Sequence, residues 1–215
     1  NNKTALITGA SKGIGKAIAQ SMAQEGCNLI LTARSEDKLN ELKSHLQKQH
    51  NISVEVIAID LSLKNSVEKV SDFSGNIDIL INNAGAIPPG NLSNINEDTW
   101  REAWNLKVFG YINLSRLIYN KMKEDKKGVI LNIIGAAGQK PMYNYIAGTT
   151  ANAGLMAFTK ALSNGSTANG IRVLGINPGL TTSDRLITMM RGQAKEKLGD
   201  EEKWEEPLED NGLTL

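Results

Sequence analysis

Short apolar runs alternate with amphipathic stretches along most of the chain. Six runs rich in Ile, Leu, Val and Ala are separated by segments in which apolar residues recur every three or four positions. The first pattern is typical of buried strands, and the second of helices that cover them. The predicted strands are residues 4–8, 28–33, 54–59, 77–81, 129–134 and 171–176.

This alternation predicts a parallel sheet with helices on both faces, because parallel neighbours need crossover connections. The predicted fold class is therefore α/β, a doubly wound parallel sheet that is Rossmann-like, in a single domain over residues 1–215. In such sheets ligands bind beyond the carboxyl ends of the strands. The segments expected at that edge are the Gly9 loop, Asp60, residues 82–85, Gly135 and residues 178–179.

Three glycines, Gly9, Gly13 and Gly15, follow the first predicted strand in the spacing G-x-x-x-G-x-G. A loop without side chains lets backbone N–H groups and the positive end of the next helix approach a pyrophosphate. The alternative is a glycine turn that only packs the first helix on the strand. The strand and the helix on either side favour the dinucleotide site.

The chain resembles the short-chain dehydrogenase/reductase family in three ordered motifs. These are T-G-A-S-K-G-I-G at residues 8–15, N-N-A-G at 82–85 and P-G at 178–179, and the resemblance covers residues 3 to about 184. It implies a nicotinamide dinucleotide, with Asp60 beside the adenine and the loop after Pro178 near the nicotinamide amide. The cofactor-binding residues that it implies are Gly9, Ser11, Lys12, Gly13, Ile14, Gly15, Arg34, Asp60, Leu61, Asn83, Ala84, Gly85, Pro178, Gly179 and Thr181.

The end of the second strand favours NADP over NAD. An acidic residue there accepts hydrogen bonds from a ribose 2′-hydroxyl, whereas this chain has Ala33 and then Arg34. Arg34 can bind a 2′-phosphate bidentately, and Lys12 adds a second cation. Two solvated surface cations are the alternative, and Glu36 and Asp37 would weaken phosphate binding by repulsion. We predict NADP as the cofactor, with NAD as the alternative.

The catalytic pattern of the family is only partly matched. Its members use an Asn, a Ser, a Tyr and a Lys four residues after the Tyr to move a proton. Asn105 matches the Asn. Counting without a gap places Gly135, Gly148 and Asn152 at the Ser, Tyr and Lys positions, so that all three functional groups are missing.

Tyr145 is the alternative proton donor. A three-residue shift places it at the donor position, and Thr149 then falls where the Lys is expected. Tyr143 is a further candidate, and a loop aromatic packed beside the pocket is the competing interpretation for both. The predicted catalytic residues are Asn105 and Tyr145.

Two hypotheses about function follow from these motifs. The first is an NADP-dependent oxidoreductase that interconverts a carbonyl and a secondary alcohol by hydride transfer, and the intact cofactor motifs favour it. The second is a nucleotide-binding protein of the same fold that acts as a sensor, regulator or structural partner. The loss of the Ser, Tyr and Lys groups favours the second.

Composition and charge exclude several other classes. Lys and Arg number 24 against 23 Asp and Glu, so the net charge of +1 points to neither nucleic acid nor an anionic membrane. Cys27 stands alone, which rules out an intrachain disulfide, and no apolar run approaches the ~18 residues of a membrane span. We expect a cytoplasmic protein. His45 and His50 have no Cys or carboxylate at ligand spacing, so no metal is predicted.

The resemblance implies that the C-terminal part forms a substrate lid over about residues 180–210. Met189, Met190 and Trp204 would supply apolar contacts there, although an amphipathic helix with one covered side is the favoured alternative. No strand-like run follows residue 176. Either the protein is naturally short or a tail is omitted. If a seventh strand is absent, the sixth strand is an exposed edge of the sheet. The resemblance also implies a homodimer or homotetramer formed by the helix with Asn105 and the helix over 151–162.

Overall fold

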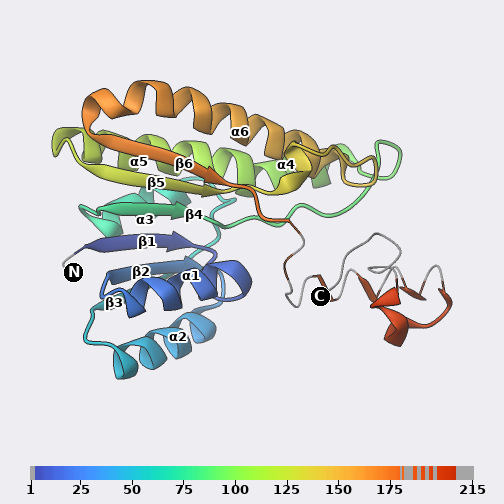
Figure 1. Cartoon of the computed structure of the whole chain (residues 1–215), viewed down its shortest axis with the longest axis horizontal. Helices are drawn as coiled ribbons and strands as arrows, with labels where there is room; N and C mark the ends of the chain where they lie inside the picture. Colours follow the sequence, from blue (N-terminus) through green and yellow to red (C-terminus); the bar gives the residue numbers. More distant parts are fainter. Residues whose placement is uncertain are drawn as a thin grey trace. The chain divides into compact units, whose positions relative to one another are not determined.

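The sheet of the computed structural model has six parallel strands in the order β3-β2-β1-β4-β5-β6. The structure describes residues 3–179, 181, 186–187, 190–191, 194–195 and 198–206. Figure 1 shows the strands side by side with helices on either side of them. The strands are β1 (Thr4–Thr8), β2 (Asn28–Ala33), β3 (Val54–Ala58), β4 (Ile79–Asn82), β5 (Gly128–Ile133) and β6 (Ile171–Ile176).

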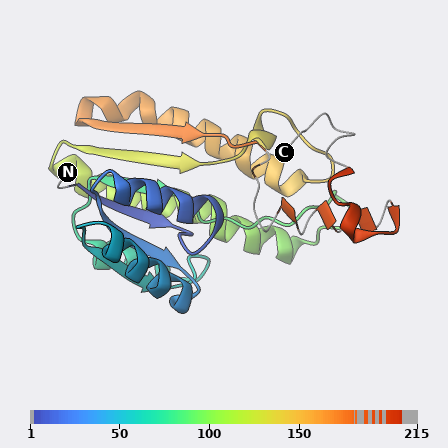
Figure 2. The same cartoon turned by 60° about the horizontal axis from the view of Figure 1, so that its bottom comes forward.

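Helices connect successive strands and cover both faces of the sheet. Helices α1 and α2 pack on one face, and α3 and α5 pack on the other, where α6 also contributes Leu162. Both views show α6 running along β6 (Figures 1 and 2). The helices are α1 (Gly13–Gln24), α2 (Glu36–Gln49), α3 (Ser66–Ser74), α4 (Glu97–Trp104), the π-helix η1 (Asn105–Phe109), α5 (Gly110–Glu124), the 3-10 turn η2 (Ala136–Gly138), α6 (Ile146–Ser166), and the 3-10 turns η3 (Thr167–Asn169) and η4 (Glu201–Lys203).

Alternate residues of β1 to β5 enter two separate core clusters, whereas β6 contributes Ile171 and Val173 to only one of them. In β1, Ile7 belongs to the cluster under α1 and α2, whereas Leu6 belongs to the cluster under α3 and α5. Both side chains are fully buried. This burial on both faces is why the strands read as continuous apolar runs.

The strand order reverses between β1 and β4. From β1 the chain proceeds outward through β2 to β3, then returns to the other side of β1 with β4. At such a point the loops that follow the two central strands diverge, and a ligand can enter between them. The loop after β1 begins at Gly9 and the segment after β4 begins at Asn83, so the two motifs predicted to bind a dinucleotide are neighbours.

The fold class and the six strands were predicted correctly, with small differences at the ends. The third strand stops at Ala58, because its last pair with β2 joins Ala58 to Ala33. The fourth starts at Ile79 and includes Asn82, which pairs with Asn132 of β5. The observed β5 begins and ends one residue earlier than predicted.

The last strand, β6, lies at an edge of the sheet. Leu174 and Ile176 of this strand are about half exposed, at 52% and 49%. No strand follows β6 among the residues that the structure describes. In that same part of the chain, no helix combines the length and the apolar character needed to cross a membrane.

The chain divides into two compact units, Asn1–Asn177 and Pro178–Leu215. In the second unit Leu186 and Met190 are buried, and Trp204 packs against them. Met189 lies outside the described residues. The packing of Met190 with Trp204 accounts for the apolar side of this segment. The role of residues 180–210 as a lid and the single-domain organisation remain predictions.

Candidate active site

The glycine loop after β1 forms a cradle that a single methyl group would fill. A Cβ at Gly15 would collide with the carbonyl oxygen of Gly9 and would lie 2.5 Å from Nδ2 of Asn83. A Cβ at Gly9 would lie 2.9 Å from Cα of Ala84, and Gly9 has a φ of +67°, which favours glycine. Gly9, Gly15 and the Asn83–Ala84 segment therefore approach one another so closely that only glycine fits at positions 9 and 15.

Hydrogen bonds join the end of β1 to the N-N-A-G segment after β4. The hydroxyl oxygen of Thr8 accepts hydrogen bonds from the backbone N–H groups of Asn83 and Ala84, both at 2.9 Å. The side-chain amide of Asn83 donates to the carbonyl oxygens of Thr8 and Gly9, at 2.9 and 3.2 Å. Thr8 was not predicted as a site residue, although it is the first residue of the motif.

Helix α1 begins at Gly13, within this glycine loop. Helix α1, which is described throughout, has no acidic residue in its first turn, and Lys12 precedes it as an exposed cation. Ser11 is partly buried, and Ile14 packs against the core under α1 and α2. The helix dipole and the unpaired N–H groups of the first turn favour an anion at this end.

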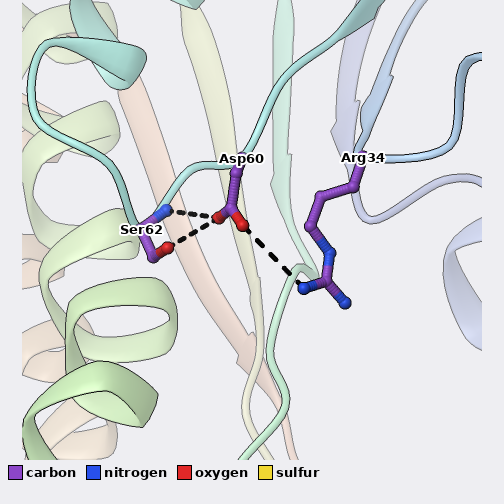
Figure 3. Close-up of polar contacts among 3 residues, drawn as sticks. All are labelled: Arg34, Asp60 and Ser62. Atoms are coloured by element: carbon purple, nitrogen blue, oxygen red, sulfur yellow. Dashed lines mark hydrogen bonds and ion pairs between the residues drawn. The ribbon is translucent and has the colours of Figure 1, made fainter.

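Arg34 and Asp60 meet at the carboxyl ends of β2 and β3 (Figure 3). Nη1 of Arg34 lies 3.8 Å from Oδ2 of Asp60, and the arginine side chain is 72% exposed. The next residue, Leu61, is buried at 7% exposure. The guanidinium is thus oriented beside the loop after β3 while most of it faces solvent.

Asp60 is held in its charged form. Burial raises the pKa of this carboxyl group, but hydrogen bonds from the hydroxyl and N–H of Ser62, together with Arg34, outweigh burial and bring the pKa below its ordinary value. Oδ1 accepts both Ser62 bonds, at 2.7 and 2.9 Å. An ionised Asp60 accepts hydrogen bonds and donates none.

Asn105 begins the π-helix between α4 and α5 and is exposed. With Trp100, Trp104 and Phe109 it lines an open groove of about 540 Å³ along α4. The side chain of Lys107, two residues further on, lies in a different place, over Gly85. The predicted catalytic role of Asn105 stays a prediction.

Gly135 follows β5 and faces the side chain of Asn152 on α6. A Cβ at Gly135 would lie 2.9 Å from Nδ2 of Asn152, and the φ of Gly135 is +135°. Asn152 is only 2% exposed, and its Oδ1 has no hydrogen-bond partner among the described residues. A buried polar atom without a partner is costly, which marks this amide as a place for a further donor.

The ring of Tyr145 lies over Gly148. A Cβ built at Gly148 would overlap the ring atoms of Tyr145, whose residue immediately precedes α6. Gly148 is buried and Tyr145 is partly buried. Tyr145 and Gly148 are therefore adjacent in space, and the aromatic ring uses the room that the glycine leaves.

The backbone around Tyr145 is fixed by the loop that follows β4. Gly90 and Tyr145 form a parallel bridge, in which Gly90 N–H donates to Asn144 at 2.7 Å and Ile146 N–H donates to Gly90 at 3.1 Å. Tyr143, by contrast, is 71% exposed. Of the two tyrosines, the structure brings Tyr145 into a packed position and leaves Tyr143 outside it.

Lys107 lies at the carboxyl ends of β4 and β5, and it was not predicted from the sequence. Its Nζ donates a hydrogen bond to the carbonyl oxygen of Ile134 at 2.5 Å. Its Cδ lies 2.8 Å from where a Cβ of Gly85 would stand. Its position two residues after Asn105 was the only signal in the sequence, and that spacing alone does not show which residue of a helix faces the sheet.

A buried polar chain runs from β4 to α6 behind the site. The amide of Asn82 donates to Asn132 at 2.8 Å and to Ser115 at 2.9 Å, and the amide of Asn132 donates to Thr159 at 2.9 Å. All four side chains are at most 6% exposed. This chain connects the strand that ends in N-N-A-G with the helix that contains Gly148.

Pro178, Gly179 and Thr181 belong to the second unit, where the Thr181 hydroxyl donates to the carbonyl oxygen of Gly179 at 3.3 Å. Their contact with the nicotinamide stays a prediction. His45 is in α2 and His50 follows it. Within the described residues, no three His, Cys, Asp or Glu side chains gather as a metal site.

A family model described as short chain dehydrogenase matches residues 3–194 of the chain. This match includes the glycine cradle, the N-N-A-G segment and the residues around Tyr145. It therefore covers every element that builds the site described above.

Individual relatives extend this match. The uncharacterized oxidoreductase YvaG of Bacillus subtilis is 31% identical over 192 residues, which is 87% of this chain and 72% of YvaG. The NADPH-dependent reductase BacG of Bacillus subtilis is 29% identical over 97% of this chain and 82% of its own. The crystal structure of L-sorbose reductase from Gluconobacter frateurii, complexed with NADPH and L-sorbose, has a TM-score of 0.90 and 30% identity over 98% of this chain and 82% of that chain.

Proposed function

The chain belongs to the short-chain dehydrogenase family, and we propose that it is an NADP-dependent oxidoreductase that interconverts a carbonyl and a secondary alcohol. The observation that supports this best is the glycine cradle between β1 and β4. Backbone from both strands converges there at the N-terminus of α1. Such a site is suited to a pyrophosphate.

The residues present fit a dinucleotide. A Cβ at Gly15 would fill the cradle, and the α1 N-terminus offers N–H groups to the pyrophosphate. Asp60, with its pKa lowered, is suited to accept hydrogen bonds from the adenosine part of the cofactor. When bound, the reduced nicotinamide supplies a hydride for carbonyl chemistry.

Arg34 and Lys12 support NADP over NAD. The Arg34 guanidinium is oriented by Asp60 yet mostly exposed, so its outward donors can bind a 2′-phosphate. BacG is named as NADPH-dependent, and the L-sorbose reductase structure contains NADPH. The NADPH named for these two relatives is the cofactor that the positive charge of Arg34 at the end of β2 favours.

Tyr145 is the proposed proton donor. In the reducing direction the carbonyl carbon accepts the hydride with its electron pair, and the C=O π pair moves to oxygen. That oxygen takes the proton of Tyr145, and the pair of the broken O–H bond stays on the phenol oxygen until solvent returns a proton. Tyr145 suits this role because its ring lies over Gly148 and the bridge to Gly90 fixes its backbone.

The substrate class is a small-molecule ketone, aldehyde or secondary alcohol. We extend the proposal to a cytoplasmic enzyme that forms a homodimer or homotetramer, with Asn105 holding a water near the reacting groups. The proposed partners include neither nucleic acid nor membrane, in keeping with the net charge of +1.

Nucleotide titration tests the cofactor. NADPH and NADH are titrated into the purified chain and followed by fluorescence, with Arg34→Ala as the variant and Arg101→Ala as the control. Arg101 is matched, because its side chain is also 72% exposed and ion-paired, to Glu97. We expect NADPH to bind at least about tenfold more tightly than NADH, Arg34→Ala to remove that preference, and Arg101→Ala to keep it. Equal binding of both nucleotides by the wild type would contradict the preference for NADP, and tighter binding of NADH would favour NAD.

Turnover separates the enzyme from a nucleotide sensor. A panel of ketones and aldehydes with NADPH is compared for wild type, Tyr145→Phe and the exposed control Tyr143→Phe. We expect turnover that falls about 100-fold in Tyr145→Phe and less than twofold in Tyr143→Phe. Tight binding of NADPH without any turnover would support the sensor or regulator instead.

A further inference from the structure

Ser62 and Arg34 contact different oxygens of the Asp60 carboxylate (Figure 3). The hydroxyl and the N–H of Ser62 both donate to Oδ1, at 2.7 and 2.9 Å, while Oδ2 faces Nη1 of Arg34 at 3.8 Å. The two bonds from Ser62 fix the direction of the carboxylate, because they leave it little freedom to rotate. Oδ2 is therefore held toward Arg34, the residue that follows β2.

The contact with Asp60 restrains Arg34 without occupying its donors. At 3.8 Å the two groups form an ion pair and not a hydrogen bond. The guanidinium carries five N–H donors in a planar fork, so it can still bind a phosphate bidentately. The arginine side chain is 72% exposed and the aspartate side chain 29%, so the less exposed partner supplies the restraint. A long side chain that is already restrained loses less conformational freedom when it binds an anion.

The negative charge of Asp60 also repels a phosphate, so two effects of this residue compete. A phosphate bound to the outward donors of Arg34 would lie beyond the guanidinium, further from the carboxylate than the 3.8 Å of the ion pair. Water and salt weaken the interaction between exposed charges as their distance grows. The attraction that orients Arg34 should therefore exceed the repulsion between Asp60 and the phosphate.

We propose that Asp60 sets the preference for a nucleotide with a 2′-phosphate by orienting Arg34, and that Ser62 supports this preference by holding Asp60. This inference rests on the proposed function, which assigns the 2′-phosphate to Arg34. The proposed contact of Asp60 with the adenosine is common to NAD and NADP, so it does not distinguish the two nucleotides. Ser62 and Asp60 act on the phosphate through Arg34, and they are positioning residues for cofactor choice.

Two nucleotide fragments that differ only in the 2′-phosphate test the role of Asp60. The full chain is titrated by calorimetry with 2′,5′-ADP and with 5′-AMP, and the preference is the ratio of the two Kd values. Asp60→Asn keeps the shape of the side chain and an acceptor oxygen but removes the charge. It should lower the preference about threefold, which is within the range of a largely exposed ion pair. Changes in the contact with the adenosine cancel in the ratio.

Asp78→Asn is the matched control for this variant. Asp78 is also partly buried and ion-paired, with Lys127, but it precedes β4 and so lies at the opposite end of the parallel strands. Its substitution should leave the preference within about 1.5-fold of the wild-type value, because distant sites act independently.

Ser62→Ala tests the second step. The variant loses the hydroxyl bond to Oδ1 of Asp60 and keeps the N–H bond, so the preference should fall by a smaller factor of about two. Ser93 offers a matched control, because its N–H also donates to a side chain two residues earlier, Oδ1 of Asn91 at 2.9 Å. Ser93→Ala should leave the preference unchanged. An unchanged preference in Ser62→Ala would overturn the role of Ser62.

A double-mutant cycle separates orientation from direct repulsion. Asp60→Asn is repeated in the Arg34→Ala background, where no guanidinium remains to be oriented. If Asp60 acts by orienting Arg34, Asp60→Asn should then change the preference by less than about 1.5-fold. If Asp60 acts by repelling the phosphate, Asp60→Asn should strengthen the preference in both backgrounds, and that result would overturn the proposal.

The same titrations distinguish failure of this inference from failure of the proposed function. A wild type that prefers 2′,5′-ADP, with a preference unchanged in Asp60→Asn, would keep NADP as the cofactor and overturn the Asp60 proposal alone. A wild type that binds 5′-AMP equally well would overturn the proposed use of NADP and this inference with it. The melting temperature of each variant is measured without nucleotide, because loss of a purely structural contact would lower it and raise both Kd values without changing their ratio.

Discussion

The ring of Tyr145 occupies the space that a side chain at Gly148 would need. The two residues are separated by three positions, and α6 starts between them, at Ile146. Gly148 alone would suggest that the site has lost an aromatic group. The packing shows that a phenol from the preceding loop lies over that same point of the helix.

Replacing Gly148 by Ala should displace Tyr145. Glycine in a helix is ordinarily less stable than alanine by about 0.5–1 kcal/mol, but here the new methyl group would overlap the ring. We expect turnover to fall at least about tenfold, together with a lower melting temperature. Both are measured on the same preparation, by NADPH oxidation and by thermal denaturation.

Gly154 provides the control on the same helix. It is exposed, and a Cβ there would meet nothing within 4 Å. Gly154→Ala should raise the stability by up to about 1 kcal/mol and leave turnover unchanged. If Gly148→Ala behaved like Gly154→Ala, the ring of Tyr145 would not be held over the helix.

Gly15→Ala should abolish the dinucleotide cradle. The added methyl group would collide with Gly9 and press on Asn83, so the loop would have to open. We expect the Kd for NADPH to rise at least about tenfold, as measured by fluorescence titration. Gly165→Ala on α6, with open space around its Cβ, should leave the Kd unchanged.

The stability contributed by Asp78 should depend on pH. Burial raises the pKa of this carboxyl, but hydrogen bonds from Lys127 and from the N–H of Thr4 outweigh burial, so the folded pKa lies below the ordinary value. Oδ1 lies 2.5 Å from Nζ of Lys127, and Oδ2 accepts from Thr4 at 2.9 Å. The carboxylate therefore stabilises the fold above the unfolded pKa of about 4, and this contribution is lost as pH falls through the folded pKa.

Asp78→Asn tests that dependence. The free energy of unfolding at pH 7 should fall by about 1 kcal/mol, a modest value because Lys127 is largely exposed. The difference from wild type should shrink as the pH is lowered through about 4, in denaturant titrations at a series of pH values. The exposed Asp72→Asn is the control and should change little. A constant difference down to low pH would contradict the assigned ion pair.

Thr159 should contribute more to the free energy of unfolding than Thr150, an exposed threonine on the same helix. Its hydroxyl accepts from Asn132 and donates to the carbonyl oxygen of Leu155 at 2.7 Å, in a buried position. Thr159→Val keeps the shape but leaves the Asn132 amide without this partner, so unfolding should cost about 1–3 kcal/mol less. Exposed Thr150, bonded to Ile146, is the control, and Thr150→Val should stay within about 0.5 kcal/mol. Equal effects of the two substitutions on the free energy of unfolding would show that the buried hydrogen bonds of Thr159 do not contribute to stability.

The sequence by itself determined the elements and the cofactor loop. The apolar runs became six parallel strands. Burial on both faces explains the apolar character of the central strands, such as β1 and β2. Gly9 and Gly15 were also recognised from a local pattern, the glycine spacing after the first strand. A loop that another backbone segment approaches closely has no room for a side chain. These features depend on residues close together along the chain.

Only the tertiary structure decided where the candidate site residues lie relative to one another. Whether Tyr145 replaces the group missing at Gly148 depends on how a loop packs on α6, with Gly90 as its partner from another connection. The position of Lys107 depends on a π-helical turn and on the pairing of β4 with β5. Such contacts join segments far apart in the chain, and no spacing within one segment determines them, because packing energy depends on three-dimensional neighbours and not on sequence distance.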